Sequence, residues 1–169
     1  MRHAARMLAL GLCSVFLTCA ASRSAEPQPP TQVLFVCERG NVKSLMAASY
    51  FNQAAQARGW PFRAVSRGSA PQSDTAPDFI KSQLTAEGFD VSSFRAAAVT
   101  ATDVSAADLV VTIGTALPAS ASAEVSKIEE WNDIPPVSSD YTRSRAALKA
   151  RVAELLERLQ RSKLQSPAA

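Results

Sequence analysis

The sequence predicts one α/β domain built on a doubly wound, four-stranded parallel sheet with helices on both faces. The first reason is that short apolar runs alternate along the chain with segments whose apolar residues have helical spacing. The second is the run at residues 109–113, which is nearly all apolar, as in a strand buried on both faces. The third is the tight loop at residues 37–44, which leads straight from an apolar run into a helical pattern.

The first half of the chain supplies two strands and two helices. Residues 33–36 are all apolar and predict the first strand, and residues 44–58 follow with a helical apolar pattern. Residues 62–66 predict the second strand. Residues 77–87 predict a helix, because Gly88 provides a C-cap that ends it.

The second half adds two strands and a long helix. Residues 109–113 and 126–131 predict the strands, of which the second has the weaker pattern. Residues 141–161 predict the helix, whose apolar stripe consists of Leu148, Val152, Leu155, Leu156 and Leu159. In a parallel sheet the ligand crevice lies beyond the carboxyl ends of the strands, where the first strand reaches Cys37.

Residues 1–25 have the pattern of an export signal, with a basic start, an uncharged stretch and small residues near the end. The uncharged stretch has 15 residues, whereas a membrane span takes about 20. We therefore expect cleavage rather than an uncleaved anchor, which is the alternative. A lipoprotein is less favoured, because no small residue directly precedes Cys19.

The signal sets the expected organisation of the rest of the chain. Residues 26–32 are a Pro-rich leader, residues 33–162 the folded domain, and residues 163–169 a flexible tail. The expected location is periplasmic or secreted, with no stable membrane association after the signal is cleaved.

Charge and histidine content exclude several kinds of function. The chain has 18 Lys and Arg and 15 Asp and Glu, but three of the arginines lie in residues 1–25. The remainder is neutral by formal charge, so we expect no nucleic-acid partner. The same segment contains His3, the single histidine. A domain without histidine has neither a Cys-His catalytic pair nor an imidazole ligand for a metal.

Cys37 is the most informative residue of the predicted domain. Cys13 and Cys19 belong to the export signal, so Cys37 is the single thiol that remains. A lone cysteine is either a buried hydrophobic residue or a free reactive group. Its position between an apolar run and a helix start favours the reactive role, because loop amides and the helix N-terminus direct positive charge to that point.

Several motifs around Cys37 belong together. The apolar run that ends at Cys37 is followed by five residues, a basic residue, Ser44 and then Met46-Ala47. This pattern resembles the start of the low-molecular-weight protein tyrosine phosphatase superfamily, which also includes thioredoxin-coupled arsenate reductases. Later stretches are similar too: Ser66-Arg67-Gly68-Ser69, Glu87-Gly88-Phe89, residues 107–111 and residues 131–136. The resemblance covers about residues 33–160 and implies a flavodoxin-like sheet of four parallel strands.

The resemblance implies two-step phosphoryl transfer. The thiolate of Cys37 attacks phosphorus to give a phosphocysteine, an acid protonates the leaving oxygen, and water releases phosphate. Loop amides and a basic side chain hold the phosphate oxygens, so the resemblance implies no metal and no cofactor.

The implied phosphate-binding residues are Glu38, Arg39, Gly40, Asn41, Val42, Lys43 and Ser44. Gly40 and Asn41 suit positive backbone angles. Ser44 either binds the sulfur or caps the helix.

Two catalytic positions depart from the family pattern. The family places an arginine six residues after the cysteine, where this chain has Lys43. Lysine makes no bidentate clamp, so we expect turnover to suffer more than binding. By the family's spacing from tryptophan, its general acid falls at Pro135. Asp133 is the first candidate to replace it and Asp140 the second. Trp131 either walls the pocket or packs the sheet edge.

Three functions follow from these observations. The first is a Cys-dependent phosphatase that acts on an aryl phosphate, free or on a phosphorylated protein. The second is arsenate reduction, which would need an external thiol because the predicted domain has a single cysteine. The third is a non-catalytic module that binds an inorganic oxyanion or a protein partner.

Overall fold

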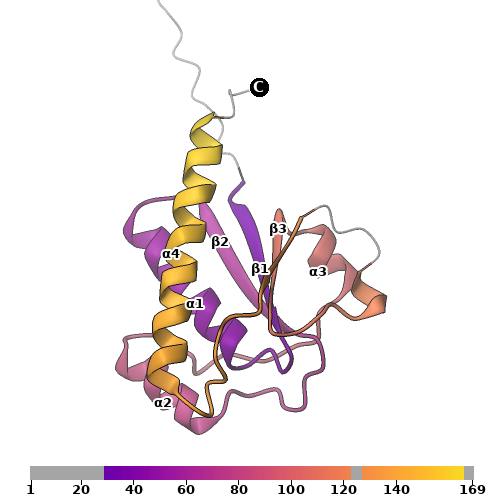
Figure 1. Cartoon of the computed structure of the whole chain (residues 1–169), viewed down its shortest axis with the longest axis vertical. Helices are drawn as coiled ribbons and strands as arrows, with labels where there is room; N and C mark the ends of the chain where they lie inside the picture. Colours follow the sequence, from indigo (N-terminus) through magenta and orange to yellow (C-terminus); the bar gives the residue numbers. More distant parts are fainter. Residues whose placement is uncertain (1–28, 123–126, 166–169) are drawn as a thin grey trace, which may run out of the picture.

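The computed structural model describes residues 29–122 and 127–165 of the chain (Figure 1). The predicted export signal, with Cys13, Cys19 and His3, lies outside the described residues. The elements follow in the order β1 (Thr31–Cys37), α1 (Lys43–Ala57), β2 (Phe62–Gly68), α2 (Asp78–Ala86), α3 (Ala101–Ser105), β3 (Leu109–Ile113), η1 (Ala119–Ala121), β4 (Ile128–Trp131) and α4 (Tyr141–Gln165).

The sheet confirms the predicted fold class. The described strands pair in parallel in the order β2-β1-β3-β4, so β1 lies inside the sheet between β2 and β3. At its carboxyl end, Cys37 is in register with Gly68 on one side and Ile113 on the other. The thiol therefore lies beyond the carboxyl ends of the strands, where parallel α/β folds place their ligand crevice.

Two hydrophobic clusters cover the two faces of the sheet, because successive strand residues point to opposite sides. Phe35 and Cys37 belong to the larger cluster, which packs beneath α1 and α4. Leu34 and Val36 belong to the smaller one, with Val104 of α3. Figure 1 shows α1 and α4 on one side of the sheet and α3 on the other. The sulfur of Cys37 is thereby directed to the face that carries α1.

Strand β1 and helix α4 are longer than the sequence predicts. Strand β1 begins at Thr31 and so includes two residues of the expected leader, because the Thr31 amide donates to the Pro61 carbonyl at 3.0 Å. Helix α4 extends to Gln165, which brings the first residues of the expected tail into the helix. The predicted start of β4 at Ser126 lies outside the described residues.

Helix α3 is absent from the sequence prediction. It has five residues and begins at a capping box, in which the Thr100 hydroxyl accepts from the Asp103 amide and the Asp103 carboxylate accepts from the Thr100 amide. Such a short element has little apolar periodicity, so its cap carries most of the signal. Within the described residues, no helix combines the length and the apolar character needed to cross a membrane.

Candidate functional site

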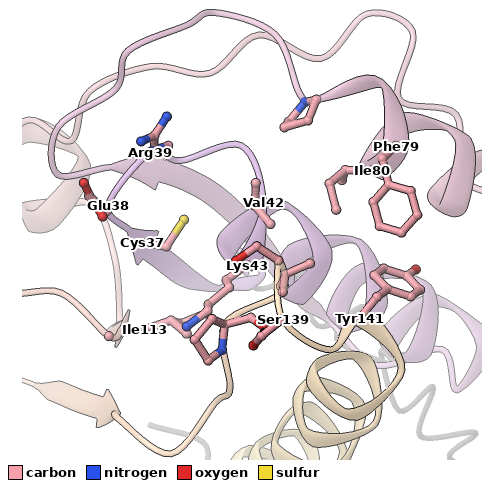
Figure 2. A pocket seen from close by; sticks show the side chains of 15 residues that line it. Cys37, Glu38, Arg39, Val42, Lys43, Phe79, Ile80, Ile113, Ser139 and Tyr141 are labelled. Carbon is pink, nitrogen blue, oxygen red and sulfur yellow. The ribbon is translucent and has the colours of Figure 1, made fainter.

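A cavity of about 740 Å³ opens at the carboxyl end of β1, beside the loop that connects β1 to α1 (Figure 2). One side of it is formed by Cys37, Glu38, Arg39, Val42 and Lys43. Cys37 is 5% exposed, and Figure 2 shows its sulfur between the loop and the first turn of α1. The cavity thus gives a small ligand access to a thiol that is otherwise enclosed.

The Cys37 sulfur has one polar side-chain partner. The sulfur and the Ser44 hydroxyl oxygen are 3.1 Å apart, and Ser44 is fully buried in the first turn of α1. A hydroxyl that donates to a thiolate stabilises it, and the free amides of a helix start act in the same direction. The N-cap of α1 is Val42, which provides no side-chain bond. Of the two roles predicted for Ser44, the structure therefore shows the bond to sulfur.

Gly40 determines the path of the loop. Its φ of +73° lies in the left-handed region, and a Cβ built on it would lie 2.5 Å from the backbone nitrogen of Gly68. The Ser66 hydroxyl donates to the Gly40 carbonyl at 2.9 Å. The loop is therefore pressed against the end of β2, where only a residue without a side chain fits.

Asn41 braces the loop from the other side. Its side-chain nitrogen donates to the Thr75 carbonyl at 2.7 Å, and its side-chain oxygen is buried without a partner in the described structure. No described residue other than glycine has a positive φ, so the expectation of a positive angle at Asn41 is wrong. The reason is that Gly40 alone supplies the reversal, which leaves Asn41 as a buried tie to the segment before α2.

Lys43 connects the loop to the segment between β4 and α4. Its ammonium donates to the Ile134 carbonyl at 3.0 Å. In Figure 2 the Lys43 side chain ends near Ile113, on the side of the Cys37 sulfur away from Arg39. Lys43, which stands at the family's arginine position, therefore uses one of its hydrogen bonds to stabilise the segment between β4 and α4.

Glu38 and Arg39 form the exposed tip of the loop. In Figure 2 the Glu38 carboxylate is turned away from the opposite wall, where Phe79, Ile80 and Tyr141 lie. Arg39 borders both the main cavity and a second one of about 300 Å³. Of the two, only Arg39 has the charge that suits an anionic ligand.

The wall opposite the loop is mostly apolar. It consists of Pro77, Phe79, Ile80, Pro136, Val137 and Tyr141. The rings of Phe79 and Tyr141 meet edge to face, with centroids 5.3 Å apart. Such a wall accommodates an aromatic or aliphatic group attached to an anion that is bound at the loop.

Glu87 fixes this wall through a network that the sequence pattern did not indicate. Its carboxylate accepts from the hydroxyls of Tyr50 and Tyr141, from Arg145 and from Lys149, at distances of 2.7 to 3.2 Å. Burial raises the pKa of Glu87, but the bonds from Arg145, Lys149 and Tyr141 outweigh burial and hold the pKa at about 2. Its tyrosine and basic partners lie 37 to 62 residues from it in the sequence, so only the fold assembles the network.

The two candidate acids lie elsewhere. Asp133 is ion-paired with Arg151 on α4 at 2.7 Å, and this hydrogen bond lowers the pKa of its carboxyl. Asp140 accepts from the Arg143 amide at 2.9 Å and so caps α4. Neither carboxylate is among the groups that line the cavity. The structure therefore does not bring either of them to Cys37.

Trp131 is a core residue. It is 1% exposed, and its ring lies 5.5 Å from that of Phe35, centroid to centroid. Its indole nitrogen donates to Glu129. Of the two roles considered, packing is the one that the structure shows. In the described part of the chain, no three His, Cys, Asp or Glu side chains gather in a way that could hold a metal ion.

A family model described as low molecular weight phosphotyrosine protein phosphatase matches residues 32–165. The chain belongs to this family. The match includes the loop with Cys37 and Ser44 and both walls of the cavity. A comparison with curated proteins gives no match.

Solved structures agree with this assignment. YfkJ from Bacillus subtilis is 21% identical, with a TM-score of 0.71 over 81% of this chain and 99% of that chain. The low molecular weight protein tyrosine phosphatase from T. tengcongensis is 25% identical, with a TM-score of 0.62 over 76% and 99%. A thioredoxin-dependent arsenate reductase from Corynebacterium glutamicum is 23% identical, with a TM-score of 0.61 over 80% of this chain and 65% of that chain. The superfamily that the motifs resemble is thus confirmed.

Proposed function

We propose that this member of the family is a Cys37-dependent phosphatase of low activity that hydrolyses aryl phosphate monoesters. The observation that carries the proposal is the contact between the Cys37 sulfur and the buried Ser44 hydroxyl at the floor of the cavity. That contact supports a nucleophilic role for Cys37, because a hydroxyl partner and the first amides of a helix both favour a thiolate.

The first step transfers the phosphoryl group to sulfur. The Cys37 thiolate supplies an electron pair to phosphorus, an S–P bond forms, and the bond from phosphorus to the leaving oxygen breaks with its electron pair on that oxygen. The backbone amides of residues 38–44 and the N-terminus of α1 support the negative charge on the phosphoryl oxygens. Arg39 borders the same cavity and adds a positive charge.

The second step regenerates the thiolate. Water attacks phosphorus, the S–P bond breaks with its electron pair on sulfur, and the water loses a proton as inorganic phosphate forms. The Ser44 hydroxyl supports the returning negative charge on sulfur, 3.1 Å away. The residues of the cavity supply the nucleophile and support the negative charges in both steps, and the proton of the attacking water passes to solvent.

The apolar wall supports an aryl group as the other half of the substrate. Phe79 and Tyr141 lie across the cavity from the loop, and their edge-to-face pair offers an aromatic ring an apolar corner to pack against. A phosphotyrosine side chain on a protein has this shape. The pattern of residues 1–25 supports export as part of this proposal, so the substrate would be met in the periplasm or outside the cell.

The test is hydrolysis of 4-nitrophenyl phosphate at mildly acid pH. We expect slow turnover by the purified protein and a loss of at least about a thousandfold in Cys37→Ser, since the hydroxyl is a far weaker nucleophile at that pH. Ser44→Ala, which keeps the sulfur and removes its partner, should lose about tenfold. Turnover that is equal in wild type and Cys37→Ser would contradict the proposal.

A second candidate is the oxyanion-binding module. The observation in its favour is that the Lys43 ammonium is bonded to the Ile134 carbonyl rather than left free for a ligand. Thermal stabilisation by phosphate, without turnover above the Cys37→Ser background, would support this module. No observation of the site favours arsenate reduction, for which the described residues supply no second cysteine.

A further inference from the structure

The cavity contains few groups that could protonate a leaving oxygen. Among the described residues, Glu38 is the one carboxylate that lines it. Figure 2 shows the Glu38 carboxylate on the outer side of the loop, turned away from the wall against which a leaving group would lie. A general acid must come within hydrogen-bond reach of the atom it protonates, and Glu38 is directed away from that region.

Three other proton-bearing groups of the cavity already donate to acceptors in the protein. The Tyr141 hydroxyl donates to Glu87 at 3.0 Å, and the Ser139 hydroxyl donates to the Pro136 carbonyl at 2.9 Å. Burial and the neighbouring carboxylate of Glu87 both raise the pKa of Tyr141. The Lys43 ammonium donates to the Ile134 carbonyl.

The acidic residues of the segment between β4 and α4 are held at other positions. The Asp133 carboxylate is bound to Arg151, and the Asp140 carboxylate accepts the Arg143 amide at the start of α4. Both contacts lie outside the cavity, whose lining from this segment is Pro136, Val137, Ser138 and Ser139. The segment thus presents a proline, a valine and two hydroxyls to the ligand, and no carboxyl group.

We propose that the site acts on phosphate compounds whose leaving group departs as an anion, without a proton from the protein. This inference rests on the proposed function and names its substrate class: aryl phosphates of acidic phenols, acyl phosphates and phosphoanhydrides. In each, the leaving oxygen keeps the electron pair of the broken P–O bond and is stable as an anion. Phosphate esters of aliphatic alcohols fall outside the class, because an alkoxide is a poor leaving group.

The transition state of phosphoryl transfer makes this restriction strong. In its loose form, the bond to the leaving oxygen is largely broken, so that oxygen carries much of the negative charge. A positioned general acid neutralises this charge and typically contributes about 10²-fold to 10⁴-fold in rate. A site that lacks the acid depends instead on the acidity of the leaving group itself. Tyrosine, with a phenol pKa of about 10, makes a slow substrate by this criterion.

The experiment is a leaving-group series on the wild-type protein. It measures kcat/KM for 2,4-dinitrophenyl, 4-nitrophenyl and phenyl phosphate and for free phosphotyrosine, and plots the logarithm against the pKa of the released phenol. We expect kcat/KM to fall steeply, by several-fold to roughly tenfold for each unit of phenol pKa. A flat plot would show that the protein supplies a proton and would overturn the inference.

Three variants identify any hidden acid. Glu38→Gln, Asp133→Asn and Lys43→Met are each expected to leave the slope of the plot unchanged, whatever they do to its height. A variant that steepens the slope would reveal its residue as the acid and overturn the inference while leaving the phosphatase intact. Absence of turnover even with 2,4-dinitrophenyl phosphate and acetyl phosphate, relative to Cys37→Ser, would overturn the proposed function and the inference together.

Discussion

The cavity has a first wall, the loop from β1 to α1, and a second wall, the side opposite that loop. The two walls differ in how closely they follow the family's pattern. The loop from β1 to α1 has the cysteine, the serine seven residues later and a glycine reversal, all fixed by buried contacts. The segment from β4 to α4 is part of the second wall, and it offers one proline, one valine and two serines to the cavity. The comparison teaches that the cysteine loop and the segment opposite it are separable parts of the site. The loop has the cysteine, the serine and the glycine of the pattern, whereas the opposite segment presents no carboxylate to the cavity.

Substitution of Gly40 tests how tightly the first wall is fixed. In Gly40→Ala, the new methyl group would meet the Gly68 backbone at 2.5 Å in addition to the strain of a positive φ. We expect a loss of about 3 kcal/mol in the free energy of unfolding, measured by urea denaturation. We also expect loss of turnover, because the loop amides would move.

Gly59 provides a matched control for this prediction. Its φ is +65°, but a Cβ there would meet nothing within 4 Å. Gly59→Ala should therefore cost only the backbone strain, about 1 kcal/mol. Equal costs for the two variants would mean that contact with β2 does not fix the loop.

The loop could be predicted because its information is local. An apolar run of 33–36, a glycine and a helix start occur within a dozen residues, and each leaves a short-range signal. The contact between Cys37 and Ser44 follows from this spacing once β1 leads directly into α1. Once the strand order is known, the face that carries α1 follows from the handedness of parallel connections.

The second wall could not be predicted because its contacts are long-range. The spacing from Trp131 indicates which residues are near the cavity. The position of the Asp133 carboxylate, however, is decided by Arg151, which lies on α4, 18 residues after Asp133 in the sequence. In the same way, the partners of Glu87 lie 37 to 62 residues away. The residues next to a side chain in the sequence do not indicate such a distant partner. The direction of the side chain therefore becomes known only once the fold is known.

Replacement of Lys43 by arginine tests whether the cation limits turnover. A guanidinium forms two parallel bonds to phosphate oxygens, which an ammonium cannot do. In Lys43→Arg we expect kcat/KM for 4-nitrophenyl phosphate to rise by about tenfold to a hundredfold. The bond from Lys43 to the Ile134 carbonyl would be changed at the same time, with an effect on stability of about 1 kcal/mol.

Lys43→Met is the control for charge. It removes both the cation and the tie to Ile134, so turnover should fall below that of wild type and the second wall should loosen. If Lys43→Arg had no more activity than Lys43→Met, the residue would serve the wall rather than the phosphate. In that case one residue of the loop, Lys43, would belong to the second wall by its role.

Glu87→Gln tests the packing of the second wall, with the smallest expected effect. The ordinary pKa of this carboxyl is 4.5 and its folded value is about 2, so its ionised form stabilises the fold. That stability is fully present above about pH 4.5 and is lost as the pH falls through about 2. Because Arg145 and Lys149 are partly exposed, solvent screening limits the contribution to about 1–2 kcal/mol. Denaturation at pH 7 should show this loss in Glu87→Gln, and at pH 2 the stabilities of wild type and variant should approach each other.

Glu157→Gln is the control. It lies at an exposed position of α4 and should change stability by less than about 0.5 kcal/mol at either pH. A loss in Glu87→Gln that did not depend on pH would mean that shape, and not the charge shared with Tyr141 and the two cations, fixes the apolar wall.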